Sequence, residues 1–359
     1  MTLKRPLKIL LTSVGCPGAP ALIRRLKNNG EREITIIGID MNPYATGFNM
    51  VDSPYIVPPA NDEDYIQSLL TIIEEEQPNI LFPQSSSEVG PISRNKKKFE
   101  NLDVNVMVSK PEPIEICNNK YELFEFLKSR GLKTPEYYYP KDLDEFQECA
   151  KLLGFPNKRV CFKPHISKGS RGFRIIDPEI NKVDILMNQL PFNRFMSMNE
   201  FVEMFQDIDL PQFLLMEYLE GPECTVDTLV SDGETLLATV KTREKARSGL
   251  AMIFKTLNRP DLESYSEHAM KELGLDYCIN VQFKGEHLIE INPRVSTFAY
   301  QDDLVLPYLA LKWLLGEITK EELAAQKSKI QYGRITIRYY EQYGVKDFHV
   351  PSVLGKKIG

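Results

Sequence analysis

Three oxygen-bearing residues, Gln282, Glu290 and Asn292, have the types and the spacing of ligands for a hard metal ion. Residues 281–292 alternate apolar and polar side chains around Lys284-Gly285-Glu286, a segment typical of a hairpin loop. Because side chains alternate along a strand, we expect the three polar residues to share the face opposite the apolar ones. Mg²⁺ prefers carboxylate and amide oxygens and usually keeps substrate phosphates among its roughly six ligands. The hairpin therefore predicts a magnesium site that carries a nucleotide.

Arg294 lies two residues beyond Asn292, so we expect its guanidinium to face the same phosphates. Positive charge at such a point stabilises a phosphoryl group during its transfer. The alternative interpretation of the whole segment is the polar face of an exposed hairpin that ends in an Asn-Pro turn.

A second candidate site is the glycine-rich stretch 167–173, which follows an apolar segment that ends in a lysine. Backbone N–H groups in such a stretch can turn toward an anion, and its basic side chains add positive charge. The residues concerned are Lys163, Lys168, Gly169, Ser170, Arg171 and Gly172. The order of a Walker A loop is absent. We predict a flexible cover over phosphates, and the alternative is a mobile basic hairpin tip.

Residues 214–223 form an apolar segment that runs into a tight turn with two spaced acidic residues. Such a segment can offer backbone groups to a purine edge and a carboxylate to ribose hydroxyls. Alone it is a weak signal, because Gly-Pro after a strand is an ordinary turn.

The composition restricts the class of protein. A chain of 359 residues suggests two or three domains, and a net charge of −6 argues against nucleic-acid binding. The six cysteines show no metal-binding spacing, which indicates reduced thiols. The first residues lack the apolar run of a signal peptide, and no stretch approaches about 18 apolar residues. We therefore expect a cytoplasmic protein with no membrane or nucleic-acid partner.

The periodicity changes along the chain. Residues 7–108 alternate strand-like and helical segments, which is typical of a parallel sheet of Rossmann type. The first turn, residues 12–20, lacks the Gly-x-Gly-x-x-Gly order, so dinucleotide binding is not favoured. Residues 110–113 suggest a linker, and strands dominate from 159 to 241, which favours an α+β arrangement. We predict domains over 1–112, 113–212 and 213–359, the second bearing the glycine-rich loop.

The order of these motifs is more specific than any one of them. First comes Lys120, at the start of a predicted helix, and then Lys163, at the end of a predicted strand and just before the glycine-rich loop. The segment Glu217-Tyr218-Leu219-Glu220 follows, and the series ends with Gln282 and the Glu-x-Asn-x-Arg motif of residues 290–294. Over roughly residues 7–315 the chain resembles the ATP-grasp superfamily, in the branch of carbamoyl-phosphate synthetase and stand-alone carboxylate ligases. The resemblance implies a Rossmann-like domain followed by a two-subdomain ATP-grasp fold, α/β and then α+β.

The resemblance also implies roles for single residues. Lys120 and Lys163 would contact the phosphates of ATP, and the 167–173 loop would close over them. Adenine would be held mostly by backbone atoms of Glu217, Tyr218 and Leu219, and ribose by Glu223. The metal ligands would be Gln282, Glu290 and Asn292, for one or two Mg²⁺ ions, with Mn²⁺ as a substitute.

Three basic residues would act near the transferred phosphoryl group, namely Arg294, Lys241 and Arg243. For Lys241 and Arg243 a solvated run of charges is an equal alternative. The chain departs from the family where many members carry Glu in place of Gln282, which weakens a second metal site. Asn119 stands where an acidic residue is common, which leaves the role of Lys120 less certain.

Candidates for binding the acceptor lie in loops that follow predicted strands. In the family, the Rossmann-like domain faces the nucleotide site. The candidates are Ser13, Gly15, Ser85, Ser86, Glu88 and Ser296. The serines are equally well explained as helix caps.

Such a site can phosphorylate a carboxylate with ATP, which makes an acyl phosphate that an amine can attack. We expect an ADP-producing carbon–nitrogen ligase, with a small carboxylate and an amine as partners and a homodimer as one compatible state. The alternatives are a phosphotransferase that releases the phosphorylated product and a nucleotide-binding protein without turnover. The combination of Glu290, Asn292 and Arg294 argues against the last.

Overall fold

The computed structural model describes residues 4–167, 169, 171–188, 194–247, 250–345 and 350–353. The chain forms two compact units by packing. The first comprises Met1–Glu115, Cys224–Gln282 and Ile291–Gly359, and the second Ile116–Glu223 and Phe283–Glu290. This division runs across the three predicted domains, whose boundaries stay predictions.

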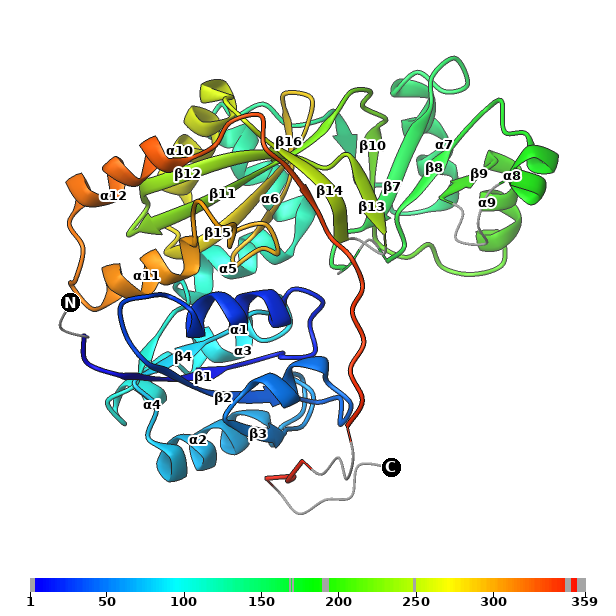
Figure 1. Cartoon of the computed structure of the whole chain (residues 1–359). Coiled ribbons are helices and arrows are strands. Elements are labelled where there is room, and N and C mark those ends of the chain that lie inside the picture. Colours follow the sequence, from blue (N-terminus) through cyan, green and yellow to red (C-terminus); the bar gives the residue numbers. More distant parts are fainter. Residues whose placement is uncertain are drawn as a thin grey trace. The chain divides into compact units, whose positions relative to one another are not determined.

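The first unit opens with a parallel sheet in the order β3-β2-β1-β4-β5, which confirms the Rossmann-type prediction (Figure 1). Its strands are β1 (Leu7–Leu11), β2 (Ile34–Asp40), β3 (Ser53–Ile56), β4 (Ile80–Phe82) and β5 (Asn105–Val106). β1 pairs with β2 and with β4, so the strand order reverses at β1. In parallel sheets, ligands bind beyond the carboxyl ends of the strands at such a switch point.

Helices cover both faces of this sheet because successive strand residues point to opposite faces. Helix α1 (Ala19–Lys27) packs with Ile9, Leu11 and their neighbours in one apolar cluster. Helices α2 (Tyr65–Glu76), α3 (Val89–Arg94) and α4 (Lys96–Glu100) pack in another, which holds Leu10, Ile37 and Leu81.

A larger sheet follows in the order β13-β14-β12-β11-β15-β16, with β17 beside β14. Its strands are β11 (Glu223–Ser231), β12 (Glu234–Thr242), β13 (Lys245–Arg247), β14 (Leu250–Leu257), β15 (Tyr277–Lys284), β16 (His287–Asn292) and β17 (Ile335–Ile337). The helices of this part are α10 (Pro260–Leu273), α11 (Leu306–Leu314) and α12 (Lys320–Gln326). β11 and β12 pair antiparallel, as do β12 and β14.

The β15–β16 hairpin turns through Gly285 and Glu286, one residue fewer than the loop we expected. Gly285 has φ +59°, which suits the first position of a tight two-residue turn. The expected three-residue loop is therefore wrong, whereas the alternation within each strand is unaffected.

The second unit contains a sheet in the order β6-β10-β7-β8-β9. Its strands are β6 (Tyr137–Tyr138), β7 (Val160–Pro164), β8 (Arg174–Ile176), β9 (Phe195–Met196) and β10 (Phe213–Glu217). Its helices are α6 (Lys120–Ser129), α7 (Leu143–Leu152), α8 (Lys182–Asn188) and α9 (Met198–Phe205). The core is aromatic: Phe146 stacks on Phe201 with ring centroids 4.0 Å apart, and Phe162 meets Phe201 edge-on at 4.9 Å.

The linker expected at residues 110–113 is wrong, because helix α5 (Pro111–Asn118) begins there. Pro111 and Pro113 lie in the first turn of this helix, where backbone N–H groups have no partner within the helix. Prolines at these positions therefore start a helix as readily as they interrupt one.

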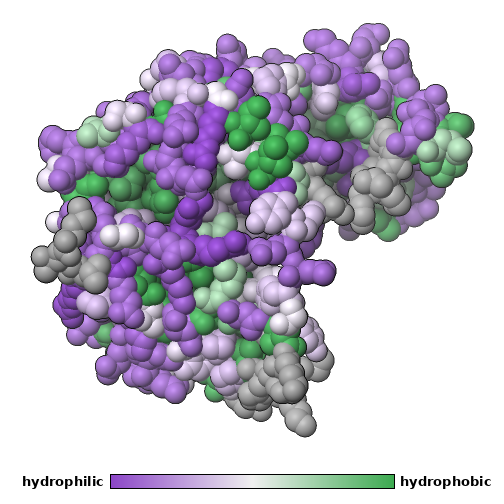
Figure 2. Space-filling model, in the orientation of Figure 1, coloured by the Kyte–Doolittle hydropathy of each residue, from purple (hydrophilic) through white to green (hydrophobic). Residues whose placement is uncertain are grey.

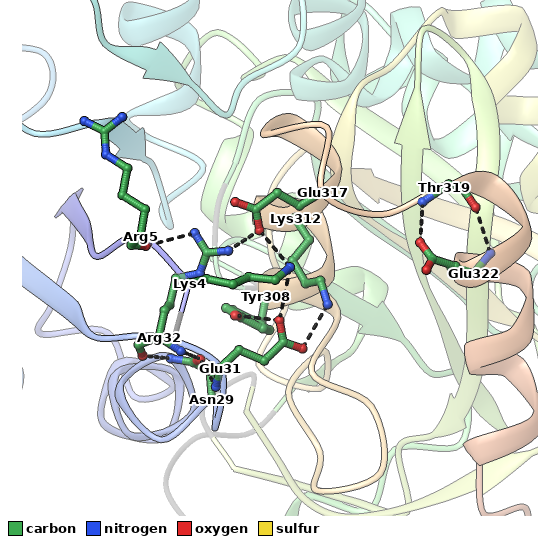
Figure 3. A network of polar contacts seen from close by, with 10 residues as sticks. All are labelled: Lys4, Arg5, Asn29, Glu31, Arg32, Tyr308, Lys312, Glu317, Thr319 and Glu322. Carbon is green, nitrogen blue, oxygen red and sulfur yellow. Dashed lines mark hydrogen bonds and ion pairs between the residues drawn. The ribbon is translucent and has the colours of Figure 1, made fainter. Parts of the chain in front are cut away.

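A polar network joins the Rossmann-like part of the first unit to helix α11 and the turn after it (Figure 3). The Arg32 side chain is buried, and its guanidinium pairs with Glu317. Lys4 Nζ lies 3.1 Å from Glu317 Oε2, and Lys312 Nζ lies 2.9 Å from Glu31 Oε1. Burial opposes ionisation of both carboxyl groups, but the hydrogen bonds and charges of their basic partners outweigh it. The pKa values of Glu31 and Glu317 are therefore lowered.

The face shown in Figure 2 is mostly hydrophilic, with apolar residues in separate patches. Strand β17 exposes 60% of Ile335 and 68% of Ile337. Within the described ranges, no helix combines the length and the apolar character needed to cross a bilayer.

Candidate active site

Two lysines, Lys120 buried and Lys163 partly buried, lie in the second unit. Asn119 caps helix α6, its side chain accepting hydrogen bonds from the backbone N–H groups of Tyr121 and Glu122, and this places Lys120 at the first helical position. Lys120 is 5% exposed, and its Nζ donates to the carbonyl of Ser167 at 2.9 Å. Lys163, near the end of β7, donates from Nζ to the carbonyl of Ile289 at 3.1 Å. Of the two predicted phosphate lysines, Lys120 thus contacts the first residue of the glycine-rich stretch, and Lys163 lies four residues before that residue.

The electrostatics of this pair favour an anion. The pKa of Lys163 is lowered to about 8, chiefly by loss of hydration; the charge of Glu290 opposes this shift, and the charge of Lys120 adds to it. Burial also lowers the pKa of Lys120, against the influence of Glu290. One carboxylate therefore acts on two poorly hydrated ammonium groups. A polyphosphate would supply the negative charge that these lysines lack.

The glycine-rich stretch requires its last glycine. Gly172 has φ +75°, and a Cβ there would lie 2.6 Å from Cδ of Pro164. Gly169 also has a positive φ of 61°. Lys168 and Ser170 lie outside the described residues. A side chain at position 172 would displace the segment that follows β7, so the close turn depends on glycine.

The predicted adenine segment begins at the end of β10. The N–H of Glu217 donates to the carbonyl of Glu136 at 3.0 Å, and its Oε1 accepts from the N–H of Glu136 at 2.9 Å. The Cys161 thiol lies 3.5 Å from the Glu217 carbonyl. Glu136, the residue before β6, thus occupies the N–H and one carboxylate oxygen of Glu217. The expected contacts with a base therefore rest on Tyr218 and Leu219, and Glu223 lies at the first position of β11.

Glu290 and Asn292 are two residues apart on β16 and therefore share one face of that strand. Asn292 is 8% exposed, and its Oδ1 accepts from Arg294 Nη2 at 3.3 Å. Its buried Nδ2 makes no hydrogen bond with the described part of the chain. A carboxylate and an amide oxygen side by side fit a magnesium ion that takes its other ligands from phosphates and water. Among the described residues no three acidic, histidine or cysteine side chains form a group that could hold a metal ion, and the assignment of Glu290 and Asn292 as metal ligands stays a prediction.

Gln282 is engaged differently from our expectation. Its Oε1 accepts from Arg243 Nη1 at 3.1 Å, and its Nε2 donates to Asn280 Oδ1 at 3.3 Å. The Gln282 oxygen predicted to bind a metal therefore accepts from a guanidinium, as the Asn292 oxygen does from Arg294. The contact places Arg243, another predicted site residue, beside strand β15 of the predicted metal hairpin.

Arg294 is held at three atoms in the first unit. Its Nε donates to Ser86 Oγ at 3.0 Å, and its Nη1 donates to the carbonyl of Val295 at 3.0 Å. The third contact is the one with Asn292. Arg294 thus joins the end of β16 to the loop after β4, where Ser85 Oγ and Ser87 Oγ lie 2.7 Å apart.

Lys241, a predicted site residue, is buried and paired with a carboxylate. Its side chain is 2% exposed, and its Nζ lies 3.1 Å from Asp227 Oδ2. The alternative of a solvated charge run is also wrong for this residue. Its position on β12, between β14 and β11, explains the burial.

The loops at the switch point of the first sheet bind one another. Glu88 is 5% exposed, and its Oε2 accepts from Thr12 Oγ1 at 2.5 Å and Ser13 Oγ at 2.8 Å. Tyr65 OH donates to its Oε1 at 3.1 Å. Burial raises the pKa of Glu88, and these hydroxyls partly offset the effect. Glu88 therefore fastens the loops, while Ser13, with φ +50°, carries local backbone strain.

Asp40 explains why the first turn does not suit a dinucleotide. Its Oδ2 accepts from the N–H of Gly15 at 2.7 Å. In a dinucleotide fold such an N–H would approach a pyrophosphate. The carboxylate of Asp40 occupies that position and would repel a phosphate.

Sequence reasoning missed several residues that these contacts involve, above all Asp227 and Asn280. The sequence carries a weak signal for both residues. Asp227 lies two residues from Thr225, and Asn280 lies two residues from Gln282, so each pair places two polar side chains on the same face of its strand. Ser296, a predicted acceptor residue, donates from Oγ to Asp227 Oδ1 at 2.5 Å.

Two family models match parts of the chain. Residues 9–107 match the PylC-like N-terminal domain, and residues 209–337 match the family described as ATP-grasp in the biosynthetic pathway with Ter operon. A curated relative is the N-terminal section of the carbamoyl phosphate synthase large chain of Methanopyrus kandleri, 24% identical over 289 residues, which are 74% of this chain and 47% of the relative. The chain therefore spans less than half of that protein's length.

Solved structures have the same fold. The biotin carboxylase domain of the 2-oxoglutarate carboxylase of Hydrogenobacter thermophilus, solved with MgADP, ADP and bicarbonate, has a TM-score of 0.61 and 20% identity, covering 92% of this chain and 74% of that one. The L-amino acid ligase of Bacillus licheniformis has a TM-score of 0.59 and 14% identity, covering 90% and 78%. Residues 209–337 therefore match an ATP-grasp family model, residues 9–107 match the model of a PylC-like N-terminal domain, and the chain shares the fold of these solved structures.

Proposed function

We propose that the protein is an ATP- and Mg²⁺-dependent ligase that activates a carboxylate as an acyl phosphate and joins it to an amine. The observation that carries this proposal is the pair formed by the buried Lys120 and the partly buried Lys163, on both of which the charge of Glu290 acts. An excess of poorly hydrated positive charge beside a potential magnesium ligand suits a metal-bound triphosphate. The structural relatives include ligases of this kind, which supports the reaction class.

In the proposed reaction a carboxylate oxygen of the acceptor attacks the γ-phosphorus of ATP, and the bond to ADP breaks. The amine then attacks the carbonyl carbon, and inorganic phosphate leaves with the oxygen that came from the carboxylate. Lys120 and Lys163 would bind the phosphates, and Glu290 and Asn292 would hold a magnesium ion, whose charge would offset the charge that develops on the phosphoryl group. Mn²⁺ is expected to replace Mg²⁺, since it accepts the same oxygen ligands.

Arg294 is placed to act on the phosphoryl group because its fork already lies against Asn292 and Ser86. A guanidinium fixed in this way stabilises the transition state without reorganising. Ser86 and the neighbouring loops at the switch point are proposed to bind the acceptor. The glycine-rich stretch 167–173 is proposed to exclude water, which would otherwise hydrolyse the acyl phosphate.

The proposal extends to the surroundings of the enzyme. The six cysteines are free, which supports a reducing, cytoplasmic location. The relative from Hydrogenobacter thermophilus is a domain dimer by its description, and a homodimer is our expectation here, to be checked by sedimentation velocity.

The test is ADP release measured against a panel of amino acids and small carboxylic acids, with and without an added amine. ADP and a coupled product only when both are present supports the ligase. ADP with a hydroxylamine-trappable product in the absence of the amine would support a phosphotransferase instead. Measurable ATP binding without ADP release from any acceptor would refute both enzymatic readings.

Glu290→Gln is the decisive variant, with Glu286→Gln as its matched control. Glu286 lies on the turn of the same hairpin and is exposed. We expect turnover to fall by about 10²-fold or more for Glu290→Gln, as for loss of a preorganised charged group. The control should retain wild-type turnover, and equal loss in both variants would contradict the assignment.

A further inference from the structure

A buried polar cluster in the larger sheet is not used by the proposed chemistry. Asp227 on β11 and Lys241 on β12 are each 1% exposed. Asp227 Oδ2 lies 3.1 Å from Lys241 Nζ, while its Oδ1 accepts from Asn280 Nδ2 at 2.9 Å and from Ser296 Oγ at 2.5 Å. One carboxylate thus contacts two neighbouring strands and the loop that follows β16.

Stability alone does not account for such a cluster. Removing two charges from water costs more than their attraction usually returns, and apolar residues of similar volume often replace a buried ion pair without loss. Buried polar groups that are fully hydrogen-bonded do fix one arrangement of the elements they join. The useful question is therefore which elements Asp227 fixes.

The contacts of Asp227 lead to predicted site residues in two directions. Asn280 Oδ1 accepts from Gln282 Nε2, and Gln282 Oε1 accepts from Arg243. On the other side Ser296 lies two residues beyond Arg294, and its Oγ accepts from the N–H of Phe298 at 3.0 Å. Strands β12, β11 and β15 are neighbours in the sheet, so Asp227 joins its centre to the loop after Arg294 (Figure 1).

The loop after β16 is also fastened from other elements of the first unit. Tyr300 OH donates to the carbonyl of Gly18 at 2.9 Å, and the Arg338 guanidinium donates to the carbonyl of Thr297. Of the two loop residues in these contacts, Tyr300 lies in the far part of the loop, whereas Thr297 directly follows Ser296. Near Arg294 the loop is held by Ser86 through Arg294 itself and by Asp227 through Ser296.

We propose that Asp227 is a positioning residue for phosphoryl transfer. Its Oδ1 fixes the position of Ser296, and thereby the backbone that carries Arg294, relative to Asn280 and the Gln282–Arg243 pair. Lys241 balances its charge and does not contact substrate. The inference rests on the proposed function, in which Arg294 acts on the phosphoryl group.

Two double variants separate the hydrogen bonds of Asp227 from its charge. Asp227→Asn with Lys241→Met keeps an oxygen that can accept from Asn280 and Ser296 and leaves no buried charge. Asp227→Leu with Lys241→Met removes that oxygen as well. Glu263→Leu with Lys327→Met is the matched control, because this pair, with atoms 2.5 Å apart and Glu263 4% exposed, lies outside the cluster.

We expect the kcat of the Asn/Met enzyme to stay within about threefold of wild type. The kcat of the Leu/Met enzyme should fall about 10- to 100-fold, since misplacing a catalytic group by about 1 Å has an effect of this size. KM for ATP should change little in either. Hydrogen exchange of residues 294–301 should become faster in the Leu/Met protein alone, and the control should resemble wild type in both measurements.

Equal kcat and equal exchange in the two Asp227 variants would overturn the inference and leave Asp227 a structural residue. If the Leu/Met protein does not fold, Ser296→Ala in the Asn/Met background provides the same contrast by removing one donor. If the wild-type protein releases no ADP, the proposed function fails, while the exchange measurement still decides whether Asp227 fixes the loop.

Discussion

Lys163→Met is predicted to make the nucleotide-free protein more stable at neutral pH. The pKa of Lys163 falls from an ordinary 10.5 to about 8 in the folded protein, chiefly because burial removes its hydration. Each pKa unit corresponds to about 1.4 kcal/mol, so a pKa lowered by about 2.5 means that holding the ammonium charged costs at most about 3.5 kcal/mol. Methionine has a similar length and carries no charge, and it removes this cost.

The same shift fixes the sign of a pH dependence. Between about pH 8 and 10.5 the unfolded chain keeps the Lys163 proton while the folded protein has lost it. The free energy of unfolding of the wild type should therefore rise with pH across that window relative to Lys163→Met. Below pH 8 both states bind the proton, and the full penalty on folding remains.

Urea denaturation at pH 7 and pH 9.5 measures both effects. Lys151→Met, a change at an exposed lysine of helix α7, is the control and should leave the free energy of unfolding within about 0.5 kcal/mol. Nucleotide affinity, measured by calorimetry with MgADP, should fall in Lys163→Met although the protein is more stable. A less stable variant at pH 7, or parallel pH profiles for wild type and variant, would refute the reasoning.

Three further predictions follow from single contacts. Arg32→Met should destabilise the protein by about 3 kcal/mol, because it leaves Glu317 without its buried partner. The free energy of unfolding of the wild type should decline as the pH falls below 4.5, through the lowered pKa values of Glu31 and Glu317. Urea titrations at pH 7 and pH 4 check both expectations. Gly172→Ala should weaken MgADP binding and lower the free energy of unfolding by about 1–2 kcal/mol, since alanine is disfavoured at a φ of +75° and its Cβ would clash with Pro164. The control is Gly131→Ala, which has a similar φ of +72° and nothing near its Cβ. It should lower stability without weakening MgADP binding. Glu88→Gln should cost about 1–3 kcal/mol, because the amide nitrogen cannot accept the hydroxyl bonds, and unchanged stability in thermal unfolding would contradict the account of the switch point.

The parts of the fold that local patterns determine were predictable. Strand and helix alternation over residues 7–108 indicated the parallel sheet, and Asn119 with the residues after it indicated the start of helix α6. Local patterns misled at residues 110–113, where prolines suit both a linker and a first helical turn. The hairpin turn was misjudged by one residue because Lys284 fits a strand end or a loop equally well.

The contacts of the site depend on residues far apart in the chain. Asp227 reaches Ser296 across 69 positions and Asn280 across 53, and no local period reveals such a pairing. The burial of Lys241 follows from the place of β12 inside its sheet, which the sequence does not state. The engagement of Gln282 by Arg243 has the same origin, whereas Glu290 and Asn292 needed only the two-residue period of a strand.

The central claim is that an oxygen of the acceptor carboxylate becomes bonded to the γ-phosphorus of ATP. The direct measurement is to run the reaction with an acceptor labelled with ¹⁸O in its carboxylate and to determine the isotope content of the phosphate by mass spectrometry. The account predicts one ¹⁸O in each phosphate released after the amine has reacted. Inorganic phosphate without label, formed together with ADP and the coupled product, would contradict it.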